Sequence, residues 1–491
     1  MRRLLIAAGA ALALGAPGLA RAETACADLT SVKLPHAEVT AASVEKSGDK
    51  QVCKVSVTSR PTTDSDIRIE VWIPLGEAWN GKFLQLGNGG FAGQINSLFL
   101  RGLASQGYAT AGTDNGHQSK VGTSASWALG HPEKIVDFGW RSLKETADIG
   151  KTLVVAQKAG KPRRSYFLGC SDGGREALMM AQRFPGEFDG IVAGAPANYM
   201  SNLFANGAAQ QQALARPGGY LDKPQLELLQ ASALKQCGGG SYIRDPGSCR
   251  FDPGVLQCKA GSKDGCLTAP QVAAARAIYD GRRDPRTGRV YLPGVSPGAE
   301  AVNGSWQAWI TGPSQARNAD AAGYQFASNA FKYLAYADPS FDFLKMDLGQ
   351  PTERARAKMS PMIDSASPDL RAFRKRGGKL IQYHGWNDPA IPARSSIVYY
   401  EDVGRTMGRT DDFYRLYLVP GMLHCGGGLG PGTVDWLQAL DRWVVDKAPP
   451  GELTATGAAA SAGQRQLLCP YPAVARGSGE AWRCVAPSRK R

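Results

Sequence analysis

One serine of this chain occupies a setting that activates a hydroxyl for attack on a carbonyl carbon. The segment Gly169-Cys-Ser-Asp-Gly173 fits the pattern Gly-x-Ser-x-Gly. It follows the apolar run Ser165–Leu168, which predicts a strand, and precedes Arg175–Arg183, which has helical spacing. Such a turn strains the serine backbone, exposes its hydroxyl and directs the helix amide groups toward it. The motif alone also fits an ordinary glycine-rich turn, but with its strand and helix it predicts Ser171 as a nucleophile.

A serine hydroxyl attacks efficiently only when a base takes its proton and an acid orients that base. His424 follows the last predicted strand, Tyr414–Val419, and comes after an acidic loop residue, so it completes the chain order Ser, Asp, His. We therefore predict that His424 is the base. We expect the other histidines to be surface or hydrogen-bonding residues: His36, His117, His131 and His384. Because His384 ends the strand that leads to the acidic loop, it could also line the pocket.

The expected acid is Asp388, in the tight loop Gly385-Trp-Asn-Asp-Pro389 that follows the apolar run Leu380–Tyr383. There its carboxylate would accept the Nδ1 proton of His424, fix the tautomer and stabilise the imidazolium. An Asx turn before proline is the alternative interpretation. Three nearby acids look like helix-end or surface charges: Asp402, Asp411 and Asp412.

Attack on a carbonyl also needs N–H donors for the oxyanion, and removing one costs about 3 to 4 kcal/mol in the transition state. The backbone N–H of Asp172 is one candidate donor. The second would come from Gly87-Asn-Gly-Gly-Phe91, where we expect Gly90 to supply it. The glycine run also fits a plain turn or a phosphate cradle, but it lacks the Gly-Lys-Ser/Thr ending of a nucleotide loop.

The elements that must position these residues predict an α/β sheet. Lys54–Ser59 and Asp66–Pro74 alternate like antiparallel strands, and from about residue 82 short apolar runs end in Gly-rich or Asx-rich turns, with helical patterns between several of them. Both Asp388 and His424 follow strand ends, at the edge where open α/β sheets build their sites.

The strand-helix alternation stops near residue 198 and resumes near residue 379. The stretch between carries four cysteines, Gly238-Gly-Gly240, many prolines and polar segments around Trp306 and Trp309, which predicts an inserted lid domain. The expected organisation is a signal peptide at 1–22, the first part of the core at 23–197, the lid at 198–376 and the second part of the core at 377–491.

The ten cysteines are an even number and are clustered, which predicts five disulfides in an exported chain. No Cys-x-x-Cys pair occurs, so a structural zinc site or a thioredoxin-like site has little support. Cys170 directly precedes the expected nucleophile and Cys425 directly follows the expected base. A disulfide between them would hold nucleophile and base in register, and two free thiols are the alternative.

Composition favours an exported globular protein. The 491 residues are 43% hydrophobic and 20% charged, which excludes fibrous, disordered and multi-span membrane proteins. Arg2 and Arg3, the apolar run Leu4–Leu14 and Ala20-Arg-Ala22 predict a secretion signal cleaved before Glu23, rather than a retained anchor. The net charge of +14 favours anionic surfaces or acidic substrates. Because the basic residues are dispersed, we expect a solvated basic surface without a nucleic-acid or membrane partner.

Three motifs together carry a family resemblance. Gly-Cys-Ser-x-Gly-Gly-Arg, His-Gly-Trp-x-Asp and a glycine-flanked His-Cys, in this order, resemble the tannase and feruloyl esterase family, which includes a terephthalate monoester hydrolase. The similarity covers about residues 26–484. It implies an α/β-hydrolase fold with a large lid, a triad of Ser171, Asp388 and His424, and the bridge between Cys170 and Cys425. It further suggests the pairs Cys26 with Cys53, Cys237 with Cys249, Cys258 with Cys266, and Cys469 with Cys484.

This chain differs from the family at one expected metal site. Lids of this family commonly hold calcium in an aspartate-rich loop between the first two lid cysteines, but here residues 237–249 offer only Asp245 as a carboxylate. Because hard cations want six to eight oxygens, several of them charged, we expect this site to be lost or weak, with no cofactor.

By resemblance, the reaction is hydrolysis of a small ester of an aromatic acid, such as ferulic, coumaric, gallic or terephthalic acid, through an acyl-enzyme. Trp306 and Trp309 are candidates to stack on the acyl ring, and plain lid core is their alternative role. A non-catalytic ligand-binding protein on the same fold and a peptidase are the competing functions.

Overall fold

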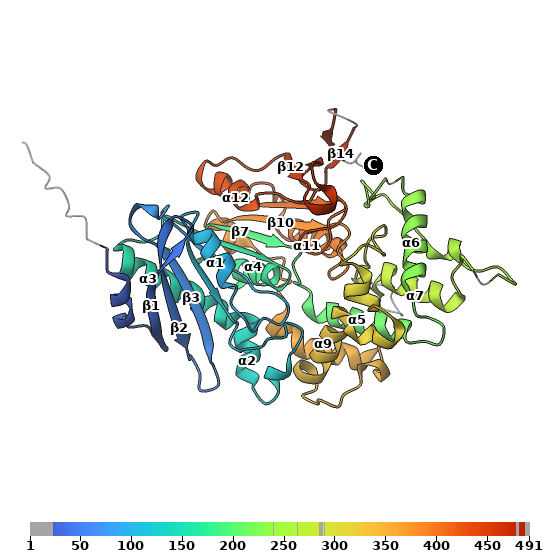
Figure 1. Ribbon diagram of the computed structural model, residues 1–491, viewed down its shortest axis with the longest axis horizontal. Coiled ribbons are helices and arrows are strands. Elements are labelled where there is room, and N and C mark those ends of the chain that lie inside the picture. Colours follow the sequence, from blue (N-terminus) through green and yellow to red (C-terminus); the bar gives the residue numbers. More distant parts are fainter. Residues whose placement is uncertain are drawn as a thin grey trace, which may run out of the picture.

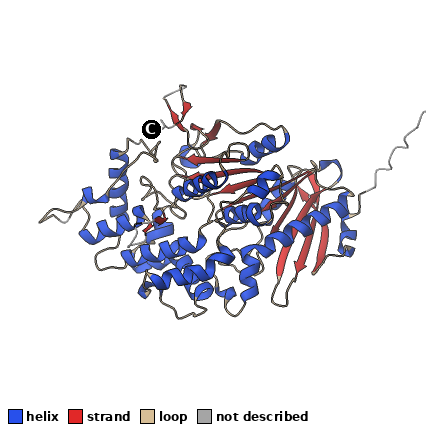
Figure 2. Cartoon of the chain, turned by 180° about the vertical axis from the view of Figure 1, so that it is seen from behind, coloured by secondary structure: helices blue, strands red, loops and turns tan. Residues whose placement is uncertain are grey.

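A mixed sheet crosses the molecule, with helices on both of its faces (Figures 1 and 2). The computed structural model describes residues 23–238, 240–262, 264–283, 288, 290–477 and 481–486, so the expected signal peptide lies outside the described residues. The sheet has nine strands within these ranges. In spatial order they are β1 (Ala37–Ser47), β2 (Lys50–Ser59), β3 (Ile67–Pro74), β5 (Ala109–Thr113), β4 (Lys82–Leu86), β6 (Arg164–Cys170), β7 (Gly190–Gly194), β10 (Lys379–Gly385) and β11 (Tyr414–Val419).

The sheet is antiparallel at one end and parallel at the other. Strands β1, β2, β3 and β5 pair antiparallel, and all pairs from β5 to β11 are parallel. The parallel strands are short and apolar, and β7 is buried along its whole length, as expected where helices cover both faces. Parallel strands end at a common edge, so the loops that follow β6, β10 and β11 meet there.

Each face of the sheet carries its own hydrophobic core. One core contains side chains of α3 (Ser142–Lys158), α4 (Asp172–Arg183) and α11 (Ala393–Met407). The other contains side chains of α1 (Ser97–Ala104) and α12 (Trp436–Val445). The loop before α3 adds the short α2 (Pro132–Val136). Burial on both faces therefore fixes the register of β6, β10 and β11, whose ends carry the expected chemistry.

The inserted lid lies between β7 and β10, where the described residues add no strand to the large sheet. Figure 1 shows its helices α5, α6, α7 and α9 together on one side of the sheet. The lid elements are α5 (Met200–Leu214), α6 (Lys223–Gln236), α7 (Ala269–Asp280), β8 (Arg282–Arg283), β9 (Val290–Leu292), α8 (Ala322–Asn329), α9 (Gln350–Ile363) and α10 (Arg371–Lys375). The fold is thus the expected α/β-hydrolase core with a large insertion.

The C-terminal segment adds two small antiparallel pairs, β12 (Leu453–Thr456) with β13 (Arg465–Leu468), and β14 (Val474–Arg476) with β15 (Arg483–Val485). Five disulfides are formed, in the pairs that the family resemblance suggested: Cys26–Cys53, Cys170–Cys425, Cys237–Cys249, Cys258–Cys266 and Cys469–Cys484. Five disulfides are typical of proteins that mature outside the reducing cytoplasm.

Candidate active site

Ser171 lies on a strained turn between β6 and α4. Its φ of 66° and ψ of −122° belong to a region that non-glycine residues rarely adopt, and its N–H donates to the carbonyl of Gly194 at 3.0 Å. Gly169 is required beside it, because a Cβ there would meet the backbone oxygen of Gly173 at 2.2 Å. The sequence therefore folds here into the strand-to-helix turn that the motif predicted, with Ser171 half-buried.

His424 bridges the serine and the acid. Its Nε2 lies 2.8 Å from Ser171 Oγ, and its Nδ1 lies 2.7 Å from Asp388 Oδ2. With Nδ1 protonated, the imidazole donates to Asp388 and accepts the serine proton at Nε2. The adjacent Cys425 has a φ of 60° and is bonded to Cys170, so the loops that hold base and nucleophile are covalently joined. The structure brings all three predicted residues together.

Asp388 is fully buried, and both of its oxygens accept hydrogen bonds. Oδ1 accepts the backbone N–H groups of Ala390 and Ile391 at 2.8 and 2.9 Å, and Oδ2 accepts from His424. Burial alone would raise the pKa of Asp388, but the charge of His424 and the hydrogen bonds from His384 and His424 lower it well below its usual range. The carboxylate therefore stays ionised wherever His424 works as a base.

A second histidine contacts the same carboxylate. His384 is fully buried, and its Nε2 lies 3.2 Å from Asp388 Oδ2 and 2.9 Å from the carbonyl of Ile391. Its Nδ1 lies 2.7 Å from Ser396 Oγ. With the serine donating to Nδ1, His384 Nε2–H donates toward Asp388 and orients it. Among the described lining residues of the pocket His384 is absent, so it supports the acid from behind.

The two expected oxyanion donors flank the nucleophile. Gly90 and Asp172 line the same cavity as Ser171, and Asp172 is the first residue of α4. Neither backbone N–H donates a hydrogen bond to any residue that the structure describes. Gly90 has a φ of 61°, and a Cβ there would meet the backbone oxygen of Gly122 at 2.4 Å. Both donors are therefore available for a carbonyl oxygen.

Buried side chains hold the loop of Gly90 in place. Glu176 on α4 accepts the N–H of Asn88 at 2.8 Å and also pairs with Asn115. At the other end of the loop, His117 Nε2 donates to the carbonyl of Phe91 at 2.7 Å. Burial and the charge of the neighbouring Asp172 raise the pKa of Glu176 to about 8. The Gly-x-Ser-x-Gly motif does not include Glu176. Its position one turn into α4 is nevertheless a sequence signal that a residue lies close to the nucleophile.

A mostly apolar cavity, open to solvent, lies over Ser171. Aromatic side chains form much of its wall: Phe91 comes from the core, and Phe204, Trp309 and Phe326 come from the lid. Phe91 contacts Phe204 and Phe326 with ring centroids 5.4 and 5.2 Å apart. The walls are therefore suited to a flat apolar group.

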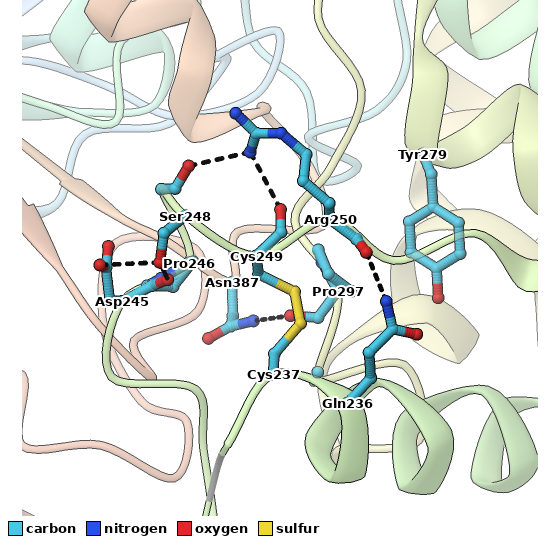
Figure 3. Close-up of a disulfide and its surroundings, with 12 residues drawn as sticks. Gln236, Cys237, Asp245, Pro246, Ser248, Cys249, Arg250, Tyr279, Pro297 and Asn387 are labelled. Carbon is cyan, nitrogen blue, oxygen red and sulfur yellow. Dashed lines mark hydrogen bonds between the residues drawn. A yellow bond between two sulfur atoms is a disulfide. The ribbon is translucent and has the colours of Figure 1, made fainter.

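The lid contacts the triad at two points. The ring of Trp309 meets the ring of His424 edge to face, with centroids 4.9 Å apart. Asn387, the residue before Asp388, donates from Nδ2 to the carbonyl of Pro297 at 3.1 Å, as Figure 3 shows. The lid thus helps to hold both the base and the acid.

The two candidate tryptophans have different surroundings. Trp309 lines the cavity, whereas Trp306 is 2% exposed and packs against Tyr279 in the core of the lid. Trp306 is not among the described residues that line the cavity. Of the two tryptophans, only Trp309 therefore faces the cavity over Ser171.

Comparisons with known proteins agree with this geometry. The family model described as tannase and feruloyl esterase matches residues 53–488. The chain belongs to the tannase and feruloyl esterase family. An esterase of Xanthomonas campestris pv. campestris is 37% identical to it over 98% of this chain and 92% of its own length. Feruloyl esterase C of Talaromyces stipitatus is 31% identical over 88% and 86% of the two chains. The crystal structure of feruloyl esterase B from Aspergillus oryzae superposes with a TM-score of 0.85 at 26% identity, covering 94% of this chain and 99% of that chain.

The protein is thus an esterase. The family resemblance implies a calcium site in one loop of the lid. In the loop closed by Cys237–Cys249, the Asp245 carboxylate accepts from Ser248 Oγ at 2.8 Å and pairs with Arg476 at 2.5 Å (Figure 3 shows the loop). The Arg476 guanidinium thus pairs with the same carboxylate oxygen that Ser248 contacts. Within the described ranges no cluster of three His, Cys, Asp or Glu side chains suits a metal ion. Of the carboxylates that calcium prefers as ligands, the loop between Cys237 and Cys249 contains only that of Asp245.

Within the described ranges, no helix combines the length and apolar character that crossing a bilayer requires.

Proposed function

We propose that this esterase hydrolyses esters of aromatic acids, outside the cytoplasm, through an acyl-enzyme on Ser171. The observation that carries the proposal is the hydrogen-bonded series Ser171, His424, Asp388 at the base of an aromatic cavity. The same arrangement of nucleophile, base and acid performs acyl transfer on unrelated folds.

In the first step, Ser171 Oγ attacks the ester carbonyl carbon while His424 Nε2 takes the hydroxyl proton. The carbonyl oxygen becomes an oxyanion that accepts from the N–H groups of Gly90 and Asp172, each contributing about 3 to 4 kcal/mol. Asp388 stabilises the imidazolium. The tetrahedral adduct then collapses, the carbon–oxygen bond to the alcohol breaks, and His424 gives its proton to the departing alkoxide.

In the second step, water replaces the alcohol. His424 takes a proton from the water as its oxygen attacks the acyl carbon, and the same two N–H groups bind the new oxyanion. The bond to Ser171 Oγ then breaks, His424 returns the proton to Oγ, and the carboxylic acid leaves. None of these steps calls on a metal, and we propose that the enzyme works without one.

The aromatic acyl group is supported by the cavity walls and by the relatives. Phe91, Phe204, Trp309 and Phe326 surround the space above Ser171, and aromatic pairs at such distances gain about 0.5 to 1.5 kcal/mol beyond burial. Several relatives are named feruloyl esterases. The five disulfides and the predicted signal support maturation in the periplasm or outside the cell.

The proposal is tested with methyl ferulate and methyl gallate, using wild type and Ser171→Ala. We expect hydrolysis of at least one ester by wild type and a loss of at least about 10³-fold in the variant. Ser126→Ala, an exposed serine on the surface, is the matched control and should behave as wild type. Hydrolysis that survives in Ser171→Ala would overturn the assignment of the nucleophile.

A further inference from the structure

The cavity wall contains two amide side chains on one helix. Asn206 and Gln210 lie one turn apart on α5 and both line the cavity, together with Leu203, Phe204 and Gly207 of the same helix. Both amides are buried, with 5% and 8% of their surface exposed. The helix therefore presents a short polar stripe to a cavity that is otherwise mostly apolar.

The side-chain amide oxygen of Asn206 has no hydrogen-bond partner among the described residues. This Oδ1 atom is buried. A buried amide oxygen without a partner costs about 1 to 3 kcal/mol. A ligand that brings a hydrogen-bond donor to this point would recover that free energy.

Asn206 lies further along α5 than the start of the helix, which adjoins the nucleophile. Ala197 donates its N–H to the carbonyl of Ser171 at 3.0 Å, so the start of α5 adjoins the nucleophile. With a rise of about 1.5 Å per residue, Asn206 lies about 9 Å further along the helix than Met200. Since Ser171, Met200 and Asn206 line the same cavity, an acyl group bonded to Ser171 can extend along α5 toward Asn206.

The charges of the wall restrict that substituent. No lysine or arginine is among the described residues that line the cavity, and its acidic member, Asp172, pairs with the buried Arg175. A second carboxylate on the ring, as in a terephthalate half-ester, would be buried without a counter-charge. A neutral hydroxyl, which both donates and accepts, matches an amide that does the same.

We propose that Asn206, assisted by Gln210, binds a ring hydroxyl of the acyl group and sets the preference for hydroxylated aromatic acids. The inference rests on the proposed function, because it assigns the acyl group of that reaction to this cavity. A site built to pair with a hydroxyl discriminates strongly against the analogue that lacks it, since the buried amide is then left unpaired.

The test compares methyl p-coumarate, methyl 4-methoxycinnamate and methyl cinnamate, which differ only at the ring position para to the propenoyl chain. We expect wild type to have the highest kcat/KM on the hydroxylated ester, by about 5- to 100-fold over methyl cinnamate. Mono(2-hydroxyethyl) terephthalate should be a poorer substrate than methyl p-coumarate. Equal rates on the hydroxylated and unsubstituted esters would overturn the proposal without any variant.

The variant Asn206→Leu keeps the size of the side chain and removes both polar groups. We expect its ratio of kcat/KM on methyl p-coumarate to kcat/KM on methyl cinnamate to fall toward one. Asn202→Leu is the matched control, because Asn202 lies on the same helix, is 9% exposed and also has an unpaired Oδ1, but is not among the described lining residues. It should keep the wild-type preference.

The outcomes separate the two proposals. Hydrolysis of methyl cinnamate by wild type, lost in Ser171→Ala, supports the proposed function even if the hydroxyl preference is absent. A preference that persists unchanged in Asn206→Leu would reject the role of Asn206. Failure of wild type on every ester would reject the proposed function and this inference with it.

Discussion

Removing the disulfide between Cys170 and Cys425 should cost both stability and activity. The two cysteines are 255 residues apart in sequence, so the loop-entropy relation assigns their bridge about 5 to 6 kcal/mol of unfolding free energy. The local effect is separate, because each cysteine is adjacent to a residue of the Ser171–His424 hydrogen bond. A displacement of about 1 Å between reacting groups costs about 10²-fold in rate.

The assay compares the double variant Cys170→Ala/Cys425→Ala with Cys469→Ala/Cys484→Ala. The second pair closes 15 residues in the C-terminal segment, neither of its cysteines is adjacent in sequence to a triad residue, and the same relation assigns it about 3 kcal/mol. Urea unfolding followed by tryptophan fluorescence gives the stabilities, and kcat and KM on methyl ferulate are measured where both variants are folded. We expect kcat to fall about 10- to 100-fold in the first variant only, with KM nearly unchanged.

Two results would refute this reasoning. A folded Cys170→Ala/Cys425→Ala enzyme with wild-type kcat would show that packing alone keeps Ser171 and His424 in register. An equal loss of kcat in the variant of the C-terminal disulfide would show that the effect is a general loosening of the fold.

Three further predictions concern groups around the site. His384→Phe removes a donor from the buried Asp388, so kcat should fall, KM should hold, and the acidic limb of the kcat/KM profile should move to higher pH; an unchanged profile would limit His384 to packing. Because the folded pKa of Glu176 is raised from 4.5 to about 8, the folded state holds the proton more tightly, and the free energy of unfolding should fall as pH rises across that range. Glu176→Gln should flatten this slope in urea titrations, and an identical slope would contradict the assignment. Excess EDTA should leave the Tm unchanged, since Asp245 pairs with Arg476; a fall in Tm that calcium reverses would reveal a metal site.

The triad could be predicted because each member follows a strand with a distinctive loop. Ser171, Asp388 and His424 come after buried apolar runs, and the parallel sheet brings their loops together. Observed strands agree with the predicted runs to within a few residues, for example β11 at Tyr414–Val419. By contrast, β1 was not predicted, because this edge strand is largely polar and its Ala37–Ser47 sequence lacks an apolar run.

The cavity wall could not be predicted from the sequence. Trp306 and Trp309 are three residues apart, a spacing that places two side chains on one face of an α-helix. A π-helical turn at Gln307–Thr311 changes that geometry, and only Trp309 reaches the cavity. Likewise, the sequence of α5 does not show which face meets the cavity, because that depends on how the lid packs on the core. The sequence alone therefore could not identify Asn206 as a residue of the cavity wall.

The lid enters and leaves the core through neighbouring strands. It departs after β7 and returns at β10, which pair directly in parallel, with Gly190 opposite Lys379. Because the two strands are parallel, the exit after Gly194 and the return at Lys379 lie at opposite ends of the pair, roughly 13 Å apart along the strands. A segment anchored in this way can be exchanged for that of a relative without changing the register of any strand. Chimeras of this kind would carry the substrate preference with the transplanted segment, while the bond-breaking residues remain with the recipient.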